Sequence, residues 1–177
     1  MSLAAFKELD CFIQGLFGED PRLPMQGINP KSTASIAGHP IHPMLIPFPI
    51  AFLVTAFATD LVFWWTQDSN WATVSMWLLG AGIVMALLAA LFGFTDFFGE
   101  PRIRNLSDAW LHMIGNLTAV LLALLNWYIR YRSGGAGVLP WGIWLSLATV
   151  LLLFFNGWKG WTLIYRHRVA VADHTRT

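Results

Sequence analysis

Charged residues are scarce in this chain. Asp, Glu, Lys and Arg make up 12% of its 177 residues, about half the share of an average globular domain, whereas apolar residues make up 56%. A soluble domain of this size needs a more charged surface, so the composition excludes an ordinary soluble fold. The net charge of +1 gives no support to nucleic-acid binding. We therefore expect an integral membrane protein.

Cysteine is almost absent, since Cys11 is the single one. One cysteine excludes an internal disulfide, a cysteine-ligated iron–sulfur cluster and a cysteine-rich zinc site. The chain also lacks the Gly-x-Ser-x-Gly elbow, the phosphate-binding glycine loop and the His-Glu-x-x-His helix. Hydrolase and transferase chemistry therefore has no motif here, and the question of enzymatic activity stays open, with a redox component as one possibility.

Long apolar runs are what the sequence does have. Each of four runs covers the roughly 20 residues that a helix needs to cross the hydrocarbon core. None shows the period of two that is typical of a β-barrel strand. The sequence predicts an all-α integral membrane protein with a four-helix transmembrane bundle over residues 36–170, followed by a polar tail over residues 171–177. The predicted spans are residues 44–66, 72–94, 109–128 and 139–161.

The first 35 residues carry a different pattern. Apolar residues repeat there at helical spacing, which predicts an amphipathic helix on the membrane surface, followed by a loop rich in Pro and Gly. A helix docked on the bundle, or on a second subunit, fits the same pattern. Lys7, Glu8 and Asp10 interrupt the apolar positions, so they do not form a secretory signal. The apolar positions are Phe6, Leu9, Phe12, Ile13 and Leu16.

Basic residues gather on one side of the predicted spans. Arg130 and Arg132 are the two on the other side, so both termini are expected in the cytoplasm. Tryptophans cluster at both ends of the spans, as in membrane–water interfaces. Asp60 is expected to extend to the external interface. The basic residues of the cytoplasmic side are Lys7, Arg22, Lys31, Arg102, Arg104, Lys159, Arg166 and Arg168.

The most specific motif is Gly38-His39-Pro40-Ile41-His42-Pro43. Each histidine precedes a proline, which favours extended or polyproline conformation, where three residues rise about 9 Å. The two imidazoles are then expected to point the same way, with one binding a ligand and the other donating a hydrogen bond. A proline-stiffened loop with histidines at the headgroups is the alternative. Pro43, Pro47 and Pro49 predict an irregular or kinked start to the first span.

His112 lies inside the third predicted span and shares a helix face with Asn116. Ionisable groups within spans usually face the bundle interior, so His112 is a candidate ligand, the alternative being a neutral imidazole bonded to a neighbouring helix. Asp96 could orient a histidine or pair with an arginine of its own loop. Arg102 and Arg104 are topology determinants that could also bind haem propionates.

His167 is expected at the cytoplasmic surface, as a further metal ligand or as an exposed histidine without one.

Several of these segments together resemble a bacterial membrane-protein family catalogued as domain of unknown function 2231, over residues 36–170. They are Gly38-His39-Pro40-Ile41-His42-Pro43-Met44, Phe48-Pro49-Ile50, Asp96, Leu111-His112-Met113 with Asn116, and Leu163-Ile164-Tyr165-Arg166-His167. The resemblance implies four membrane helices and the bacterial inner membrane. It points to redox chemistry, because some relatives look like fusions to Rieske-type modules. Arg168 and Ala170 depart from the glycines of the family's His-Gly-Val-Gly run, which weakens a role for His167.

Two functional hypotheses follow. In the first, His112 and either His39 or His42 are axial ligands of a b-type haem that exchanges electrons with a quinone or a soluble, Rieske-type partner. In the second, His39, His42, His112, His167 and Asp96 supply ligands to a divalent transition metal or handle protons. An accessory structural subunit, alone or as a homo-oligomer, is a third reading.

Overall fold

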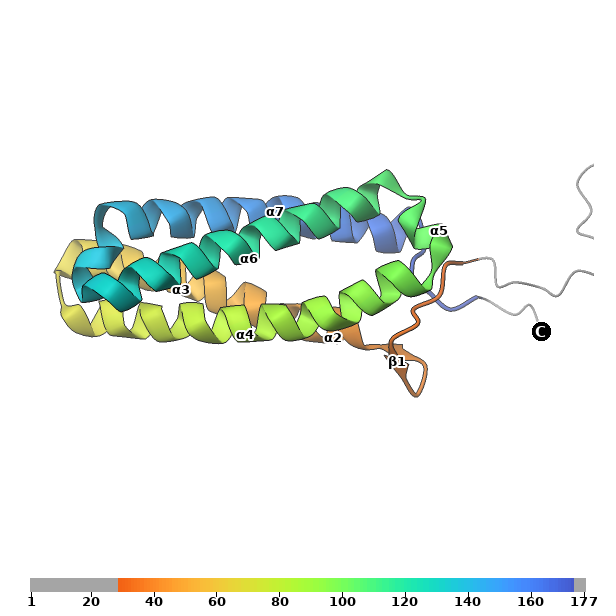
Figure 1. Ribbon diagram of the computed structural model, residues 1–177, viewed down its shortest axis with the longest axis horizontal. Helices are drawn as coiled ribbons and strands as arrows, with labels where there is room; N and C mark the ends of the chain where they lie inside the picture. The colour runs from red at the N-terminus through yellow and green to blue at the C-terminus, as the bar shows by residue number, and fades with distance from the viewer. Residues whose placement is uncertain (1–28, 174–177) are drawn as a thin grey trace, which may run out of the picture.

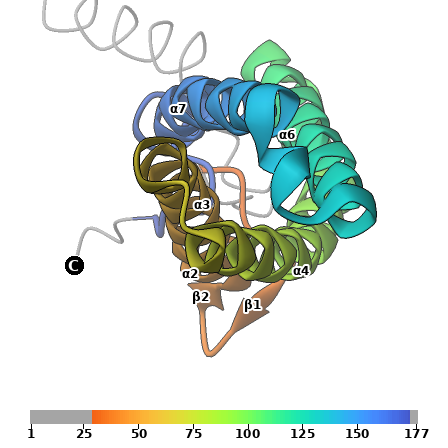
Figure 2. The ribbon, with the colours of Figure 1, turned by 90° about the vertical axis from the view of Figure 1, so that its left-hand side faces the viewer.

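The computed structural model describes residues 29–173, and in this part of the chain four long helices form an antiparallel bundle (Figure 1). They are α3 (Pro47–Thr66), α4 (Ser69–Gly99), α6 (Ser107–Ser133) and α7 (Ile143–Tyr165). Viewed along the bundle, they follow one another around a ring in chain order (Figure 2). The short elements are β1 (Ser35–Ile36), β2 (His39–Pro40), α2 (Ile41–Leu45), α5 (Pro101–Arg104), η1 (Gly134–Gly137) and η2 (Val138–Gly142).

The helices coincide with the four predicted apolar runs and extend beyond most of their ends. By length and composition, the described residues contain three candidate membrane spans, Ile41–Thr66, Ser69–Gly99 and Ser107–Tyr165. The third is 59 residues long and includes both α6 and α7 with the turn between them. The prediction of an all-α membrane protein is therefore confirmed. The helix predicted near the N-terminus falls on residues before 29, outside the described part of the chain.

Local chemistry sets the helix ends. The Asp68 carboxylate accepts a hydrogen bond from the Asn70 backbone N–H at 3.0 Å and so caps α4. Gln67, with φ of 56°, ends α3 in the left-handed conformation, and Gly134, with φ of 58°, ends α6. The connection from α3 to α4 is a tight turn, whereas η1 and η2 make up the connection from α6 to α7; each places consecutive helices side by side.

The kink predicted at the start of the first span is confirmed. α2 ends at Leu45 and α3 begins with Pro47 in its first turn, where the missing N–H costs least. The prediction of extended or polyproline backbone is confirmed for His39 and wrong for His42. His39 lies in β2 and is exposed, whereas His42 lies in the first turn of α2, which packs against α4. The backbone bond from Ile41 N–H to Ala34 O closes the hairpin and starts the helix between the two histidines.

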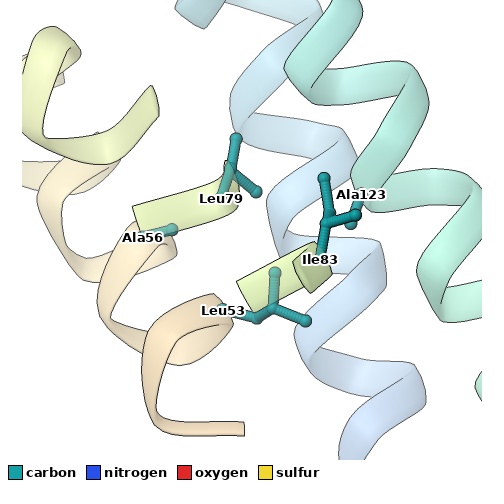
Figure 3. Packing of buried hydrophobic residues seen from close by; sticks show 5 residues of the cluster. All are labelled: Leu53, Ala56, Leu79, Ile83 and Ala123. Atoms are coloured by element: carbon teal, nitrogen blue, oxygen red, sulfur yellow. The ribbon is translucent and has the colours of Figure 1, made fainter. Parts of the chain in front are cut away.

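An apolar core fills the middle of the bundle, and an apolar surface surrounds it. Leu53, Ala56, Leu79, Ile83 and Ala123 are buried together there (Figure 3). Many larger apolar side chains point outward, among them Trp65 at 84% and Phe154 at 70% exposure. An outer surface of this kind is unsuited to water and suited to lipid.

After α7 the chain turns back across the end of the bundle. Val169 packs into a cluster with Phe97, Ile103 and Leu163, and Ala170 N–H donates to Pro30 O at 2.8 Å. This reversal requires left-handed backbone at Arg168, with φ of 54°, and at Ala170, with φ of 60°. Glycine adopts that conformation without a steric penalty, so glycine would suit both positions.

Arg168→Gly together with Ala170→Gly should therefore stabilise the protein. Left-handed backbone costs a residue with a side chain roughly 1–2 kcal/mol, and glycine avoids this cost. Glycine also makes the unfolded chain more flexible, which destabilises the folded state by roughly 0.5–1 kcal/mol and offsets part of the gain. We expect a higher thermal unfolding midpoint in detergent. Arg166→Gly is the matched control, because Arg166 has φ of −91° and should lose stability. A double variant that unfolds below the wild type would contradict this account.

Candidate functional site

Two histidines meet at the end of the bundle where α2 begins. His42 comes from α2 and His112 from the second turn of α6, and their ring centroids lie 6.3 Å apart. The rings are nearly perpendicular, at 87°. The expectation that histidines from separate helices converge holds for this pair.

One nitrogen of each ring is fixed by a backbone carbonyl. His42 Nδ1 lies 2.8 Å from Ala89 O on α4, and His112 Nδ1 lies 3.0 Å from Asn156 O on α7. A carbonyl oxygen only accepts hydrogen bonds, so Nδ1 carries the proton in both rings. In the neutral imidazole Nε2 then keeps its lone pair. Two nitrogen donors are thus available from neighbouring rings, each held in a defined tautomer.

Glycines on the facing helices make room for the two rings. A Cβ atom at Gly93 of α4 would lie 2.9 Å from His42 Cε1, and one at Gly160 of α7 would lie 3.1 Å from His112 Cε1. Contacts this short require the ring to move. Glycine at both positions therefore lets the imidazoles approach the helix backbones closely enough to reach their carbonyl partners.

An asparagine pair continues the polar cluster on the far side of His112. Asn116 Nδ2 donates to His112 O at 2.8 Å, and Asn156 Nδ2 donates to Asn116 Oδ1 at 3.3 Å. The buried Asn156 Oδ1 finds no hydrogen-bond partner among residues 29–173. It faces the Cα of Gly115, where a Cβ would overlap it. A Cα–H···O contact between α6 and α7 accounts for this arrangement.

The other predicted ligands have different partners. Asp96 Oδ1 accepts hydrogen bonds from Ser32 Oγ, Thr33 N and Ala34 N at 2.7 to 2.8 Å, so it fastens the loop before the hairpin rather than orienting a histidine. His39 Nδ1 bonds to Ala37 O at 3.0 Å in the exposed hairpin. Within residues 29–173, no three His, Cys, Asp or Glu side chains gather as metal ligands.

The end of the bundle that holds His42 and His112 also carries Arg102, Arg104 and His167. Arg102 holds Glu100 through two contacts of 2.9 Å, and its hydrogen bonding lowers the pKa of that carboxyl to about 2. Arg104 is exposed. His167 Nε2 lies 2.9 Å from Asp108 Oδ2, whose other oxygen accepts from Lys159 at 2.8 Å. His167 thus ties the chain after α7 to α6.

A second polar centre lies near the other end of the bundle. Asp60 of α3 and Arg130 of α6 form a two-contact ion pair at 2.6 and 2.7 Å, with 0% and 1% of their surface exposed. Both residues were expected at the external surface, and that expectation is wrong. They turn inward because partners from the other helices satisfy both charges, which makes the interior a better environment than lipid.

All five guanidinium N–H groups are engaged in this centre. Beyond Asp60, Arg130 donates to Ser75 of α4, Ser146 of α7 and Asn126 of its own helix. Both serine hydroxyls also donate to Asp60, at 2.5 and 2.6 Å. Each long helix contributes at least one group, so the centre ties the four helices together. The pairing of Asn126 and Arg130 at i and i+4 was the available sequence signal.

Asp60→Asn should destabilise the fold strongly, because it leaves a buried guanidinium without its counter-charge. We expect a loss of about 3–5 kcal/mol, measured by thermal or denaturant unfolding in detergent. The double variant Asp60→Leu with Arg130→Met should recover most of that loss. Arg132→Met, at an exposed position of the same helix, is the control and should change little. Equal stability of the Asp60 variant and the wild type would refute the structural role.

Gly115→Ala should also destabilise the bundle, because the methyl group would collide with the Asn156 carboxamide and separate α6 from α7. Overpacking of this kind costs about 1–3 kcal/mol. Gly157→Ala is the matched control on α7, since no described atom outside its immediate helix neighbourhood lies within 4 Å of a Cβ there. Gly157→Ala should raise the unfolding midpoint slightly. A lower midpoint for Gly157→Ala than for Gly115→Ala would contradict the proposed packing.

Comparison with known proteins gives one finding. No curated protein and no solved structure matches the chain. The family described as Predicted membrane protein (DUF2231) matches residues 38–173, which include β2, α2, all four long helices and both polar centres. The match confirms the resemblance seen in the sequence. The chain therefore belongs to the DUF2231 family of predicted membrane proteins.

Proposed function

We propose that α3, α4, α6 and α7 each cross the bacterial inner membrane, with both termini in the cytoplasm. Each helix has 20 or more residues, enough for a hydrocarbon core of about 30 Å. The distribution of basic residues supports this orientation. Arg130 does not count among the basic residues of the external side, because it is buried and Asp60 neutralises its charge within the bundle. Arg132 is then the one basic residue at the external turns, against several at the histidine end.

We further propose that the chain is a b-type haem protein that transfers electrons, and that His42 and His112 would hold the haem iron. The observation that carries the proposal is the pair of imidazoles whose carbonyl-bound Nδ1 atoms leave both Nε2 atoms as donors. Two imidazoles that each bind one metal through a nitrogen at about 2.0–2.1 Å have ring centroids at most roughly 6 Å apart. The observed separation is 6.3 Å.

Haem fits this donor set because it needs two ligands from the protein. The porphyrin supplies the remaining four nitrogens, whereas a protein-bound divalent ion usually takes three or four side chains. When bound, the haem iron would supply reversible one-electron chemistry. The chain's own contribution is to hold the ligands, and the bonds to Ala89 O and Asn156 O fix each ring and make its Nε2 more basic.

The surroundings suggest how such a group would be oriented and reached. Arg104 is exposed at the histidine end and is better placed than Arg102 to bind a propionate, because Arg102 is held by Glu100. The histidine pair lies near the end of the bundle assigned to the cytoplasm. A quinone at the membrane interface or a soluble, Rieske-type protein would be a suitable electron partner at that depth, and a homo-oligomer would be compatible with it.

A two-coordinate metal ion is the second candidate function. Imidazole nitrogen suits copper, and the 6.3 Å separation of the two rings would let both bind one ion. The chain would then be a metal-binding or metal-handling protein without haem. Met113 packs in the apolar cluster around Phe97 and Ile103, so the two imidazoles carry this candidate on their own.

The absorption spectrum of the protein, purified in detergent from cells that make haem, separates these functions. We expect a Soret band that shifts on reduction with dithionite and is lost in His42→Ala and in His112→Ala. His39→Ala and His167→Ala are the controls and should keep the band, because these residues bond to Ala37 and Asp108 instead.

A colourless protein that carries stoichiometric copper, lost in the same two variants, would reject the haem function and support the copper-binding function. A protein without colour or metal would reject both.

A further inference from the structure

The motif that contains His39 forms a hairpin that projects sideways from the bundle. β1 and β2 pair in antiparallel register, with Ile36 opposite His39. Ala37 and Gly38 form the turn, with φ of 49° and 79°. The two ribbon views show the hairpin extending outward beside α2 and α4, across the bundle axis rather than along it (Figures 1 and 2).

Hydrogen bonds fix the base of the hairpin at a defined position along the bundle axis. Thr33 Oγ1 donates to Thr95 O at 2.8 Å, and Ile41 N–H bonds to Ala34 O at 3.0 Å. Thr95 lies in the last part of α4, whose 31 residues extend about 46 Å at 1.5 Å per residue, well beyond a hydrocarbon core of about 30 Å. The hairpin therefore lies near the boundary between lipid and water.

Other side chains mark the same boundary. Trp110, Trp158, Trp161 and Tyr165 are exposed at this end of α6 and α7, as in an interfacial aromatic belt. Glu100, Arg102 and Arg104 follow Thr95 by five, seven and nine residues, so the charged groups of the aqueous side begin just beyond it. A segment that projects across the bundle axis at this height passes through the headgroup layer rather than into open water.

The tip of the hairpin has the chemistry for such a place. Ile36 is 69% exposed and is the large apolar side chain of the turn region, flanked by Ala37 and Gly38. The bond from His39 Nδ1 to Ala37 O stabilises the turn. We propose that residues 35–40 bind the lipid bilayer as an interfacial anchor, with Ile36 inserted among the upper parts of the acyl chains. Because the hairpin leads directly into α2, the anchor also sets the depth of His42 in the membrane.

An environment-sensitive fluorophore at the tip tests the proposal without reference to any cofactor. In the full chain with Cys11→Ser, Ile36→Cys is labelled with a nitrobenzoxadiazole dye and reconstituted in vesicles of phosphatidylcholine and phosphatidylglycerol. Nitroxide lipids quench the dye from a shallow or a deep position on the acyl chain, and iodide quenches it from water. Two matched variants calibrate depth: Arg104→Cys for the aqueous side and Leu91→Cys, at a 62% exposed position of α4, for the lipid side.

We expect the dye at position 36 to be quenched more by shallow than by deep nitroxides, and less by iodide than the dye at position 104. Its emission should lie between those of the two calibration variants. Iodide quenching equal to that at position 104 would overturn the proposal. So would self-quenching that rises with the protein-to-lipid ratio, because a second copy of the chain would then cover the tip.

Discussion

A polar group buried in a membrane protein must find its partners within the protein, because lipid offers none. This constraint accounts for both polar centres of the bundle. At one end, the charges of Asp60 and Arg130 bind each other and two serines from facing helices. At the other end, the imidazoles of His42 and His112 bind backbone carbonyls of α4 and α7. The apolar core between the centres packs the helices, while the polar contacts specify which faces meet.

The two centres differ in what they leave available for chemistry. The Asp60–Arg130 centre is closed, since all five guanidinium N–H groups have acceptors and both carboxylate oxygens have donors. The histidine centre is satisfied at Nδ1 and retains a lone pair on each Nε2. The first centre is therefore suited to holding the fold, whereas the second keeps the two donor nitrogens on which the proposed function rests. Gly93 and Gly160 lie beside the rings of the histidine centre and are needed for its geometry, because a methyl group at either would displace an imidazole.

Sequence reasoning located the helices well, because membrane spans depend on long apolar runs that are visible in composition. It also identified His112 and the proline kink, since both follow from single residues in an apolar context. It misjudged His42, because a proline preference describes isolated residues, whereas Ile41 bonds to Ala34 and begins a helix that includes His42. It missed the Asp60–Arg130 pair, whose members lie 70 residues apart on α3 and α6 and meet across the interior of the bundle. The left-handed backbone at Arg168 and Ala170 was not predicted, because neither residue type favours that conformation.

The central claim is that His42 and His112 face each other with protonated Nδ1 and available Nε2. Nitrogen-15 NMR of histidine-labelled protein in bilayers tests it most directly, with His39, His167 and His174 replaced so that two rings remain. Before any cofactor is added, both rings should show the neutral tautomer with the proton on Nδ1. Addition of haem or copper(I) should then move the Nε2 resonances of both. A proton on Nε2 in either ring, or a response confined to one ring, would contradict the account.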